Sequence, residues 1–346
     1  MLIKKNKSLR HALKKMSSEG KKCLLVINEI DEFLGTLSDG DIRKALLEGK
    51  NLKTNINELY NQKSTFFTEN NFDDKAAKEL FQIQKYDVIP VLDKNKRISK
   101  VLEWNDYFGE KIKEQALKRI PVVIMAGGKG TRLKPFTQIL PKPLIPINNK
   151  TVLERIIDPF HHAGANNFFL TVNYKARILK AFFEELEPSY KVKFIEEKEP
   201  LGTAGSLKNI QNKITTPFFV TNCDVIFKTD SNEILNFHNA KGFDITLVAS
   251  TKEITIPYGV CNTNKNGQLN NIEEKPTFDY LVNTGLYVLN PSMISLIPKN
   301  KYFDMTDLIK AAKKKKKKIG VFPIDENEWI DVGQWEEYEK AKQRLE

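Results

Sequence analysis

The sequence predicts an α/β protein in which a repeated α/β module precedes a larger domain with a mixed, mostly parallel sheet. Two observations carry this prediction: the first third of the chain aligns with itself, and apolar strands alternate with helical patterns from residue 121 onward. Hydrophobic residues form 40% of the 346 residues and charged residues 29%. This composition suits a packed protein of two or three domains.

The repeat lies in residues 1–115. The segment 26–42, VINEIDEFLGTLSDGDI, aligns without a gap with 91–107, VLDKNKRISKVLEWNDY, at an offset of 65. Each copy reads as strand, turn, strand and the start of a helix, and a helical pattern precedes each copy. The sequence therefore predicts helix, strand, strand and helix, twice.

The repeat and the stretch GTLSDGDI resemble a tandem pair of CBS motifs, the Bateman module. In its families this module binds adenine nucleotides or serves in dimerisation and regulation. Ser38 would cap a helix whose first N–H groups face phosphate, and Asp41 would accept from ribose hydroxyls. Glu103 replaces the serine in the second copy, although Asp106 matches Asp41, so at most one adenine-nucleotide site is intact. The alternative is that Ser38 only caps a helix and that the module serves as a dimer interface.

The domain predicted for residues 116–346 follows a charged linker or connecting helix at 111–120. Buried strands are expected at 121–127, 166–174, 191–197 and 216–227, and helices at 150–164 and 175–186. Segments 243–250, 258–276 and 282–290 are expected to continue the sheet. Such alternation predicts a Rossmann-like sheet with helices on both faces and ligands at the carboxyl ends of its strands.

A glycine-rich loop, VIMAGGKGTRLKPFTQILPKPL at 123–144, follows the first of these strands. A Walker A loop would require Lys and then Ser or Thr after its second glycine, but Arg132 stands there. A dinucleotide fingerprint would require a third glycine at Leu133. Both common phosphate-binding motifs are therefore excluded.

The string GGxGTRLxPxTxxxPKPL resembles the signature of the sugar-1-phosphate nucleotidyltransferases, and the resemblance covers residues 121–346. These enzymes join a nucleoside triphosphate to a sugar-1-phosphate and release pyrophosphate, which calls for positioning and charge neutralisation. The resemblance implies that Arg132 and Lys142 are catalytic. It also implies a nucleotide-binding loop formed by Ala126, Gly127, Gly128, Lys129, Gly130 and Thr131.

The same resemblance implies a metal site and a sugar site. Asp224, in NCD, and Asp331, in WIDVG, match the family's two metal-binding aspartates, and Mg²⁺ is the expected ion. The short motifs PYGV, EEKP and VNTG imply that the sugar phosphate is bound by Tyr258, Gly259, Glu274, Lys275, Asn283 and Thr284.

The segment PLGTAGSL at 200–207 resembles the guanylyltransferases and implies a guanine pocket lined by Gly202, Thr203 and Ala204. GTP is therefore the expected nucleotide. The CBS pair, LGTAG, NCD and the ending DVGQWEEY together resemble the branch that makes GDP-glucosamine for legionaminic acid synthesis. Mannose-1-phosphate and heptose-1-phosphate remain alternative substrates, since the spacing of polar residues does not choose among the sugars.

The net charge of +11 is compatible with nucleic acid, an anionic membrane or phosphorylated ligands as partners. No nucleic-acid motif accompanies the lysines, and no window approaches the ~18 apolar residues of a membrane span. The three cysteines lack metal-site spacing. We therefore expect a cytoplasmic protein that binds neither nucleic acid nor membrane, and the CBS resemblance implies a homo-oligomer, a dimer or tetramer.

A function of another class also fits this organisation: a catalytically silent nucleotide-sensing or assembly subunit. Such a subunit would be expected to have lost Arg132, Lys142, Asp224 or Asp331, and all four are present. The sequence therefore favours an enzyme.

Overall fold

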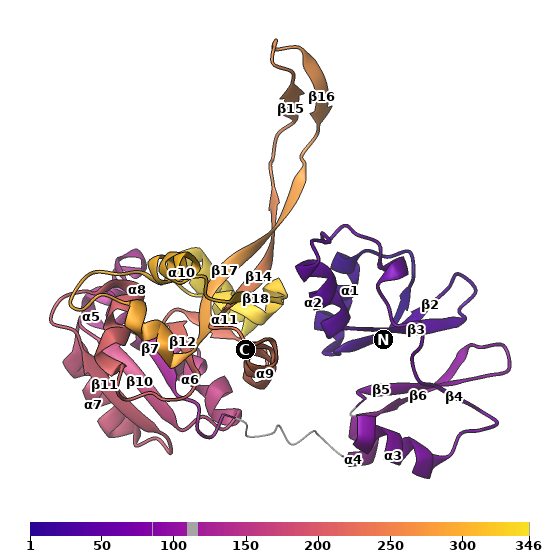
Figure 1. Ribbon diagram of the computed structural model, residues 1–346, viewed down its shortest axis with the longest axis horizontal. Coiled ribbons are helices and arrows are strands. Elements are labelled where there is room, and N and C mark those ends of the chain that lie inside the picture. The colour runs from indigo at the N-terminus through magenta and orange to yellow at the C-terminus, as the bar shows by residue number, and fades with distance from the viewer. Residues whose placement is uncertain (85, 109–116, 346) are drawn as a thin grey trace. The chain divides into compact units, whose positions relative to one another are not determined.

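The computed structural model describes residues 1–84, 86–108 and 117–345, and the chain forms two compact units (Figure 1). The first unit contains the chain up to Lys113 together with Glu253–Asp279, and the second contains Glu114–Lys252 and Tyr280–Glu346. The predicted boundary between residues 115 and 116 lies outside the described residues. Leu117, assigned to the predicted linker, is fully buried, and its N–H donates to the Ala163 carbonyl.

The repeat predicted in the first unit is confirmed. Two three-stranded sheets, β1-β2-β3 and β4-β5-β6, have the same pattern, with a parallel first pair and an antiparallel second pair. The second hairpin starts and ends 65 residues after the first, in agreement with the sequence alignment. The first copy comprises β1 (Leu2–Lys4), α1 (Leu9–Glu19), β2 (Cys23–Ile27), β3 (Phe33–Ser38) and α2 (Asp39–Leu47). The second comprises β4 (Phe67–Thr68), α3 (Asp74–Gln84), β5 (Val88–Leu92), β6 (Ile98–Glu103) and α4 (Trp104–Phe108).

The second unit is built on a seven-stranded sheet of order β11-β10-β7-β12-β17-β14-β18. The pairs β11-β10, β10-β7, β7-β12 and β14-β18 are parallel, and β12-β17 is antiparallel. The strands are β7 (Val122–Met125), β10 (Asn167–Val172), β11 (Lys191–Glu196), β12 (Phe218–Asn222), β14 (Ile245–Thr255), β17 (Thr277–Leu289) and β18 (Ile319–Ile324).

Both faces of this sheet are covered, because successive side chains of β7 pack into different hydrophobic clusters. Val122 and Ile124 pack into one hydrophobic cluster, whereas Val123 and Met125 pack into another. The predicted Rossmann-like, mostly parallel arrangement is therefore confirmed. The longer helices are α6 (Val152–His162), α7 (Ala176–Leu186), α9 (Ser231–Lys241), α10 (Met305–Lys314) and α11 (Trp335–Arg344).

Two strand predictions need correction. The segment 216–227 is broken at Cys223 and Asp224, so that β12 ends there and a new strand, β13 (Val225–Phe227), pairs with β19 (Trp329–Asp331). Residues 258–276 do not continue the main sheet. They form a separate hairpin of β15 (Val260–Thr263) and β16 (Leu269–Glu273).

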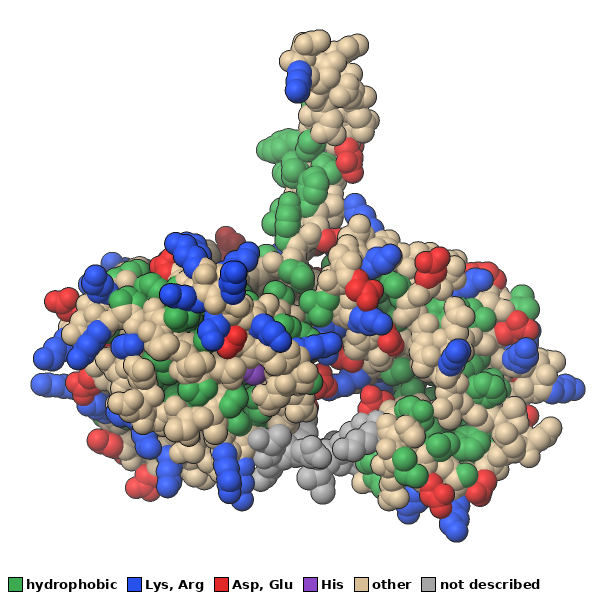
Figure 2. Space-filling view, in the orientation of Figure 1, with side chains coloured by type: hydrophobic (Ala, Val, Ile, Leu, Met, Phe, Trp, Pro, Cys, Tyr) green, Lys and Arg blue, Asp and Glu red, His purple; other side chains and the backbone are tan. Residues whose placement is uncertain are grey.

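The hairpin segment Glu253–Asp279 exposes hydrophobic side chains, seen as green atoms below its tip in Figure 2. No helix in the described residues is long and apolar enough to cross a membrane.

Candidate active site

The glycine-rich loop leaves the carboxyl end of β7 and turns back on itself at Gly130. This residue has φ +63°, and a Cβ there would lie 2.9 Å from both Lys142 Cβ and Thr137 Cγ2. The Thr137 hydroxyl donates to the Gly130 carbonyl at 2.9 Å. Only glycine fits this position without strain, and the fold of the loop depends on it.

The cationic residues of the loop differ in their surroundings. Lys129 and Arg132 are exposed, and Arg132 lies in a short 3₁₀ turn, Thr131–Leu133, that is anchored by buried Leu133. Lys142 begins a second 3₁₀ turn, Lys142–Leu144, and is only 7% exposed. Its ammonium group lies 2.5 Å from Asp224 Oδ2. Lys142 is thus a fixed charge, whereas Arg132 is free to reach toward a ligand.

Asp224 and Asp331 are brought together by the pairing of β13 with β19. Val225 is opposite Asp331 in this ladder, and the Val332 N–H donates to the Asp224 carbonyl at 2.8 Å. A Cβ on Gly333 would lie 2.8 Å from Asp331 Oδ1, 3.2 Å from Asp224 Oδ2 and 3.4 Å from Lys142 Nζ. Two carboxylates and one ammonium group therefore converge on the backbone of Gly333.

Burial raises the pKa of the Asp331 carboxyl above its usual value. The Gly333 N–H, which donates to Asp331 Oδ1 at 2.7 Å, acts in the opposite direction, while the Asp224 charge raises the pKa further. Two adjacent carboxylates of this kind fit a divalent cation. The described residues contain no group of three or more His, Cys, Asp or Glu that could hold a metal. Two carboxylates, with phosphates and water completing the shell, match the usual coordination of Mg²⁺.

The predicted guanine segment forms a single helical turn, α8 (Gly202–Gly205), held by the start of α10. The Thr203 N–H and hydroxyl both donate to Asp304 Oδ1, at 3.0 and 3.1 Å. The Ala204 N–H donates to the Phe303 carbonyl at 3.0 Å. Gly202 has φ +80°, and a Cβ there would lie 2.8 Å from Asp304 Oδ1. The segment is therefore fixed before any ligand arrives.

Two acidic residues near this segment were missed by the sequence reasoning. Asp304 holds Thr203 from about a hundred positions away, and no local pattern indicates that contact. Glu197 is 8% exposed and lies against Gly127 of the loop. It belongs to the acidic run EEKEP, which reads as surface, but its place directly after a strand of the parallel sheet was a signal that could have identified it.

The residues predicted to bind the sugar phosphate fall into both units. Asn283 and Thr284 lie on β17 in the second unit, where the Thr284 hydroxyl donates to the Val248 carbonyl at 2.8 Å and the Asn283 amide to the Tyr287 hydroxyl at 2.6 Å. Four others lie in the hairpin segment Glu253–Asp279: Tyr258, Gly259, Glu274 and Lys275. Within that segment Gly259 and Glu274 are neighbours, since a Cβ on Gly259 would lie 3.0 Å from Glu274 Oε2.

In the repeated module, Ser38 is the predicted helix cap. It caps α2 in a capping box, in which the Asp41 N–H donates to Ser38 Oγ at 3.1 Å and the Ser38 N–H to Asp41 Oδ2 at 2.8 Å. The Asp39 N–H donates to the Lys22 carbonyl at 2.9 Å. Two first-turn N–H groups are therefore already satisfied, contrary to the expectation that they are free for phosphate. The nucleotide-binding role of Ser38 and Asp41 stays a prediction.

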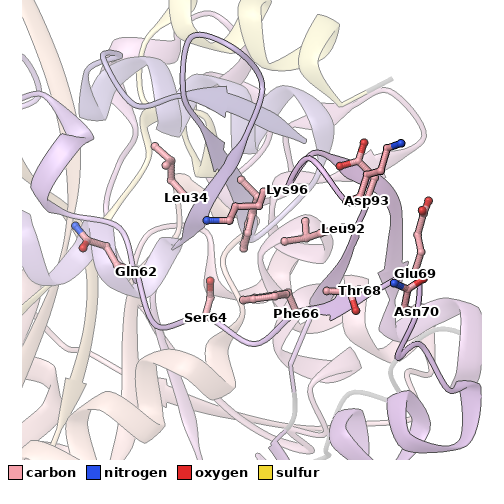
Figure 3. A pocket seen from close by; sticks show the side chains of 12 residues that line it. Leu34, Gln62, Ser64, Phe66, Thr68, Glu69, Asn70, Leu92, Asp93 and Lys96 are labelled. Carbon is pink, nitrogen blue, oxygen red and sulfur yellow. The ribbon is translucent and has the colours of Figure 1, made fainter.

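The first unit also contains a cavity of about 930 Å³, shown in Figure 3. It lies between the start of β3, the segment leading into β4, and the β5–β6 turn. Neither Ser38 nor Asp41 lines it. The lining residues are Phe33, Leu34, Gln62, Ser64, Phe66, Thr68, Glu69, Asn70, Leu92, Asp93, Lys94 and Lys96.

Comparison with family models finds two matches. Residues 121–346 match the model described as nucleotidyl transferase, and residues 1–48 match that of the CBS domain.

Among curated relatives, mannose-1-phosphate guanyltransferase of Pichia angusta is 36% identical over 224 residues, 61% of this chain and 60% of the relative. That of Hypocrea jecorina is 39% identical over 184 residues, 51% of this chain and 50% of the relative. The chain thus spans half to three fifths of these relatives.

Among solved structures, HddC from Yersinia pseudotuberculosis is 29% identical with a TM-score of 0.53, covering 66% of this chain and all of HddC. The same protein in complex with GMP-PN gives a TM-score of 0.52.

Proposed function

Because the chain belongs to the nucleotidyl transferase family, we propose that it transfers a guanylyl group from GTP to a sugar-1-phosphate, giving a GDP-sugar and pyrophosphate. The observation that carries this proposal is the convergence of Lys142, Asp224 and Asp331 beside a glycine-rich loop. In the reaction, a phosphate oxygen of the sugar-1-phosphate forms a bond to the α-phosphorus of GTP. The bond from that phosphorus to the oxygen bridging to the β-phosphate breaks, and pyrophosphate leaves with the electron pair.

The residues of the loop serve this transfer by position and charge. Gly127 and Gly128 let the backbone approach the nucleotide, and Gly130 fixes the turn. The exposed guanidinium of Arg132 can fork onto phosphate oxygens of the leaving pyrophosphate. Lys142, held in place by burial and by Asp224, neutralises charge between the two substrates. Charge neutralisation supplied in this way lowers the barrier without a covalent intermediate.

Asp224 and Asp331 would hold Mg²⁺ in this site. When bound, the ion would offset the negative charge of the triphosphate and help to orient it. Burial raises the pKa of Asp331, whereas the Gly333 N–H and the Lys142 charge lower this pKa and so favour the ionised form that a cation requires.

The case for guanine rests on the LGTAG segment and on relatives whose names specify guanyl transfer. Two sugar-1-phosphates are the favoured candidate substrates. The resemblance to the legionaminic acid branch favours glucosamine-1-phosphate, whereas the names of the curated relatives favour mannose-1-phosphate. Heptose-1-phosphate is a third candidate.

For the repeated module, we propose a role in regulation or in assembly of the protein. The CBS pair would bind an adenine nucleotide or mediate formation of a dimer or tetramer, and the proposed location is the cytoplasm. Calorimetry that detects no adenine-nucleotide binding, with Ser38→Ala changing nothing, would leave only the assembly role.

Pyrophosphate release tests the proposed function. GTP, ATP, CTP, UTP and dTTP are each combined with glucosamine-, mannose- and glucose-1-phosphate in the presence of Mg²⁺. We expect GTP with one of the first two sugars to give the highest rate, and Asp224→Ala to abolish that rate while the thermal unfolding transition is retained. Absence of pyrophosphate release in every combination would favour the silent sensing subunit.

A further inference from the structure

Trp335 is the first residue of α11 and follows Asp331 closely in the chain. The backbone between these two residues is fixed. Val332 is fully buried and its N–H donates to the Asp224 carbonyl at 2.8 Å, while the Gly333 N–H donates to Asp331 Oδ1 at 2.7 Å. Trp335 therefore extends from a rigid part of the candidate active site.

The side chain of Trp335 contacts the second half of the glycine-rich loop, although the two are far apart in the sequence. Its Nε1–H donates to the Lys134 carbonyl at 2.8 Å, and its ring centroid lies 5.1 Å from that of Phe136. Tyr338, one turn further along α11, packs edge-on against Trp335, and its hydroxyl donates to the Pro146 carbonyl at 2.6 Å. The start of α11 thus holds the loop at two places.

The carbonyl of Lys134 directly follows the 3₁₀ turn that carries Arg132. On the other side of this turn, the Leu133 N–H donates to the Gly130 carbonyl at 3.0 Å, and the Leu133 side chain is buried. The side chain of Arg132 is exposed, so the position of its guanidinium group depends on how firmly the backbone of the turn is held. The hydrogen bond from Trp335 holds the end of the turn.

The backbone position of Arg132 matters because a guanidinium group binds phosphate through two N–H groups in a fixed geometry. A small displacement of such a group weakens its stabilisation of a transition state while leaving the rest of the site intact. We propose that Trp335 is a positioning residue, whose hydrogen bond to the Lys134 carbonyl places Arg132 against the leaving pyrophosphate. This inference rests on the proposed function and adds a residue that acts through Arg132.

A purely structural role is the competing explanation, because Trp335 also packs against Phe136 and Tyr338. The two roles require different parts of the side chain, since packing requires the ring and positioning requires the N–H. Trp335→Phe keeps an aromatic ring and removes the donor. Trp329 provides a matched control, because it packs against the same hydrophobic cluster and its Nε1 has no hydrogen-bond partner among the described residues.

The test measures kcat and KM with GTP and the sugar-1-phosphate that the wild type uses best. Trp335→Phe should lower kcat by about 3- to 10-fold, the range that one hydrogen bond supplies. KM for the sugar-1-phosphate should change by less than about twofold, because the lost interaction belongs to the transition state. Trp329→Phe should keep the wild-type kcat, even if its thermal unfolding transition is lower.

A double-mutant cycle with Arg132→Ala separates positioning from packing. If Trp335 acts through Arg132, Trp335→Phe should lower the residual kcat of Arg132→Ala by less than about twofold, since the group that it positions is gone. The residual rate is measured at high enzyme concentration. Should Trp335→Phe fail to fold, 3-benzothienylalanine at position 335 keeps the bicyclic ring, lacks the N–H and should give the same kinetic results.

Three outcomes would overturn the role of Trp335 while leaving guanylyl transfer in place. They are an unchanged kcat when the N–H is removed, an equal loss of kcat in Trp329→Phe, and a full additional loss in the Arg132→Ala background. A wild type that releases no pyrophosphate with any nucleotide would instead contradict the proposed function itself.

Discussion

The glycines of the loop are required for different reasons. Gly130 adopts φ +63° and would place a Cβ against Lys142 and Thr137, whereas a Cβ on Gly128 would meet no atom of the protein within 4 Å. If Gly128 is needed, the ligand must require it. Two alanine substitutions therefore separate folding from binding.

Gly130→Ala should lower the free energy of unfolding by about 1–3 kcal/mol, because alanine is strained at this φ and crowded by its neighbours. Gly128→Ala should change stability by less than about 0.5 kcal/mol but raise KM for GTP. Thermal denaturation and steady-state kinetics measure the two effects. An unchanged KM in Gly128→Ala would show that this part of the loop does not approach the nucleotide.

Asp331 illustrates a conflict between function and stability. Its raised pKa means that the ionised carboxylate lowers the free energy of unfolding of the wild type. This destabilisation disappears as the pH falls through that pKa. Without divalent cations, Asp331→Asn should therefore unfold at a higher temperature than the wild type at pH 8. The difference should shrink as the pH falls and the wild-type carboxyl takes up a proton.

Addition of Mg²⁺ provides the control for this prediction. The ion should stabilise the wild type more than Asp331→Asn, because only the wild type keeps both proposed ligands. Equal stabilisation of both proteins by Mg²⁺ would argue against Asp331 as a metal ligand. The variant should also lose activity by about 100-fold or more.

At the scale of elements, the start of α10 supports the nucleotide site. Asp304 is the N-cap of α10 and also accepts both hydrogen bonds from Thr203. Asp304→Ala should lower stability by about 0.5–2 kcal/mol through loss of the cap, and should raise KM for GTP because the LGTAG segment loosens.

Asp230 gives a matched control, since it caps α9 by accepting from the Asn232 N–H at 2.9 Å and has no contact with the LGTAG segment among the hydrogen bonds of the described residues. Asp230→Ala should show a similar loss of stability with an unchanged KM. If both variants raise KM equally, the effect of Asp304 is a general consequence of instability.

Regular elements were predictable from the sequence because hydrophobic periodicity reports burial locally. The helices α6 and α7 and the strands β10 and β11 lie where the apolar patterns placed them. The break between β12 and β13 was not predictable in this way, because apolar residues stand on both sides of the short polar stretch around Cys223 and the whole segment reads as one strand. It is caused by long-range pairing of Val225 with Asp331, more than a hundred positions away.

The candidate site, like the fold, was predictable from the sequence only in part. The glycines, Arg132, Lys142, Asp224 and Asp331 were named from the motif, yet the motif does not reveal which of them are in contact. Asp304 was missed because it contacts a residue that is distant in the sequence. Glu197 was missed because it lies in an acidic run, although its side chain lies against Gly127. For Asp304 the contact becomes visible only in three dimensions, whereas the position of Glu197 after a strand was a signal in the sequence.

At the scale of the whole molecule, the two units have separate hydrophobic cores. The two clusters that sandwich the main sheet contain only residues from Leu117 onward, and the clusters of the repeated module contain none of them. The fragment 117–346 should therefore fold and keep kcat within about threefold of the full chain. Calorimetry and pyrophosphate release would measure this.

A regulatory role of the repeated module predicts a further difference. Adenine nucleotides should change the rate or oligomeric state of the full chain and have no effect on the fragment. If truncation alters neither the oligomeric state, nor kcat, nor the nucleotide response, the repeated module has no regulatory function.

The central claim is transfer of a guanylyl group at the site formed by the glycine-rich loop, Lys142, Asp224 and Asp331. The most direct test supplies the full-length protein with Mg²⁺, an equimolar mixture of GTP, ATP, CTP, UTP and dTTP, and glucosamine- and mannose-1-phosphate, and identifies the products by mass spectrometry. We predict a GDP-sugar formed in equal amount with pyrophosphate, absent from a parallel reaction with Asp224→Ala. A product carrying another base would contradict the assignment of guanine, and the absence of any nucleotide sugar would contradict the central claim.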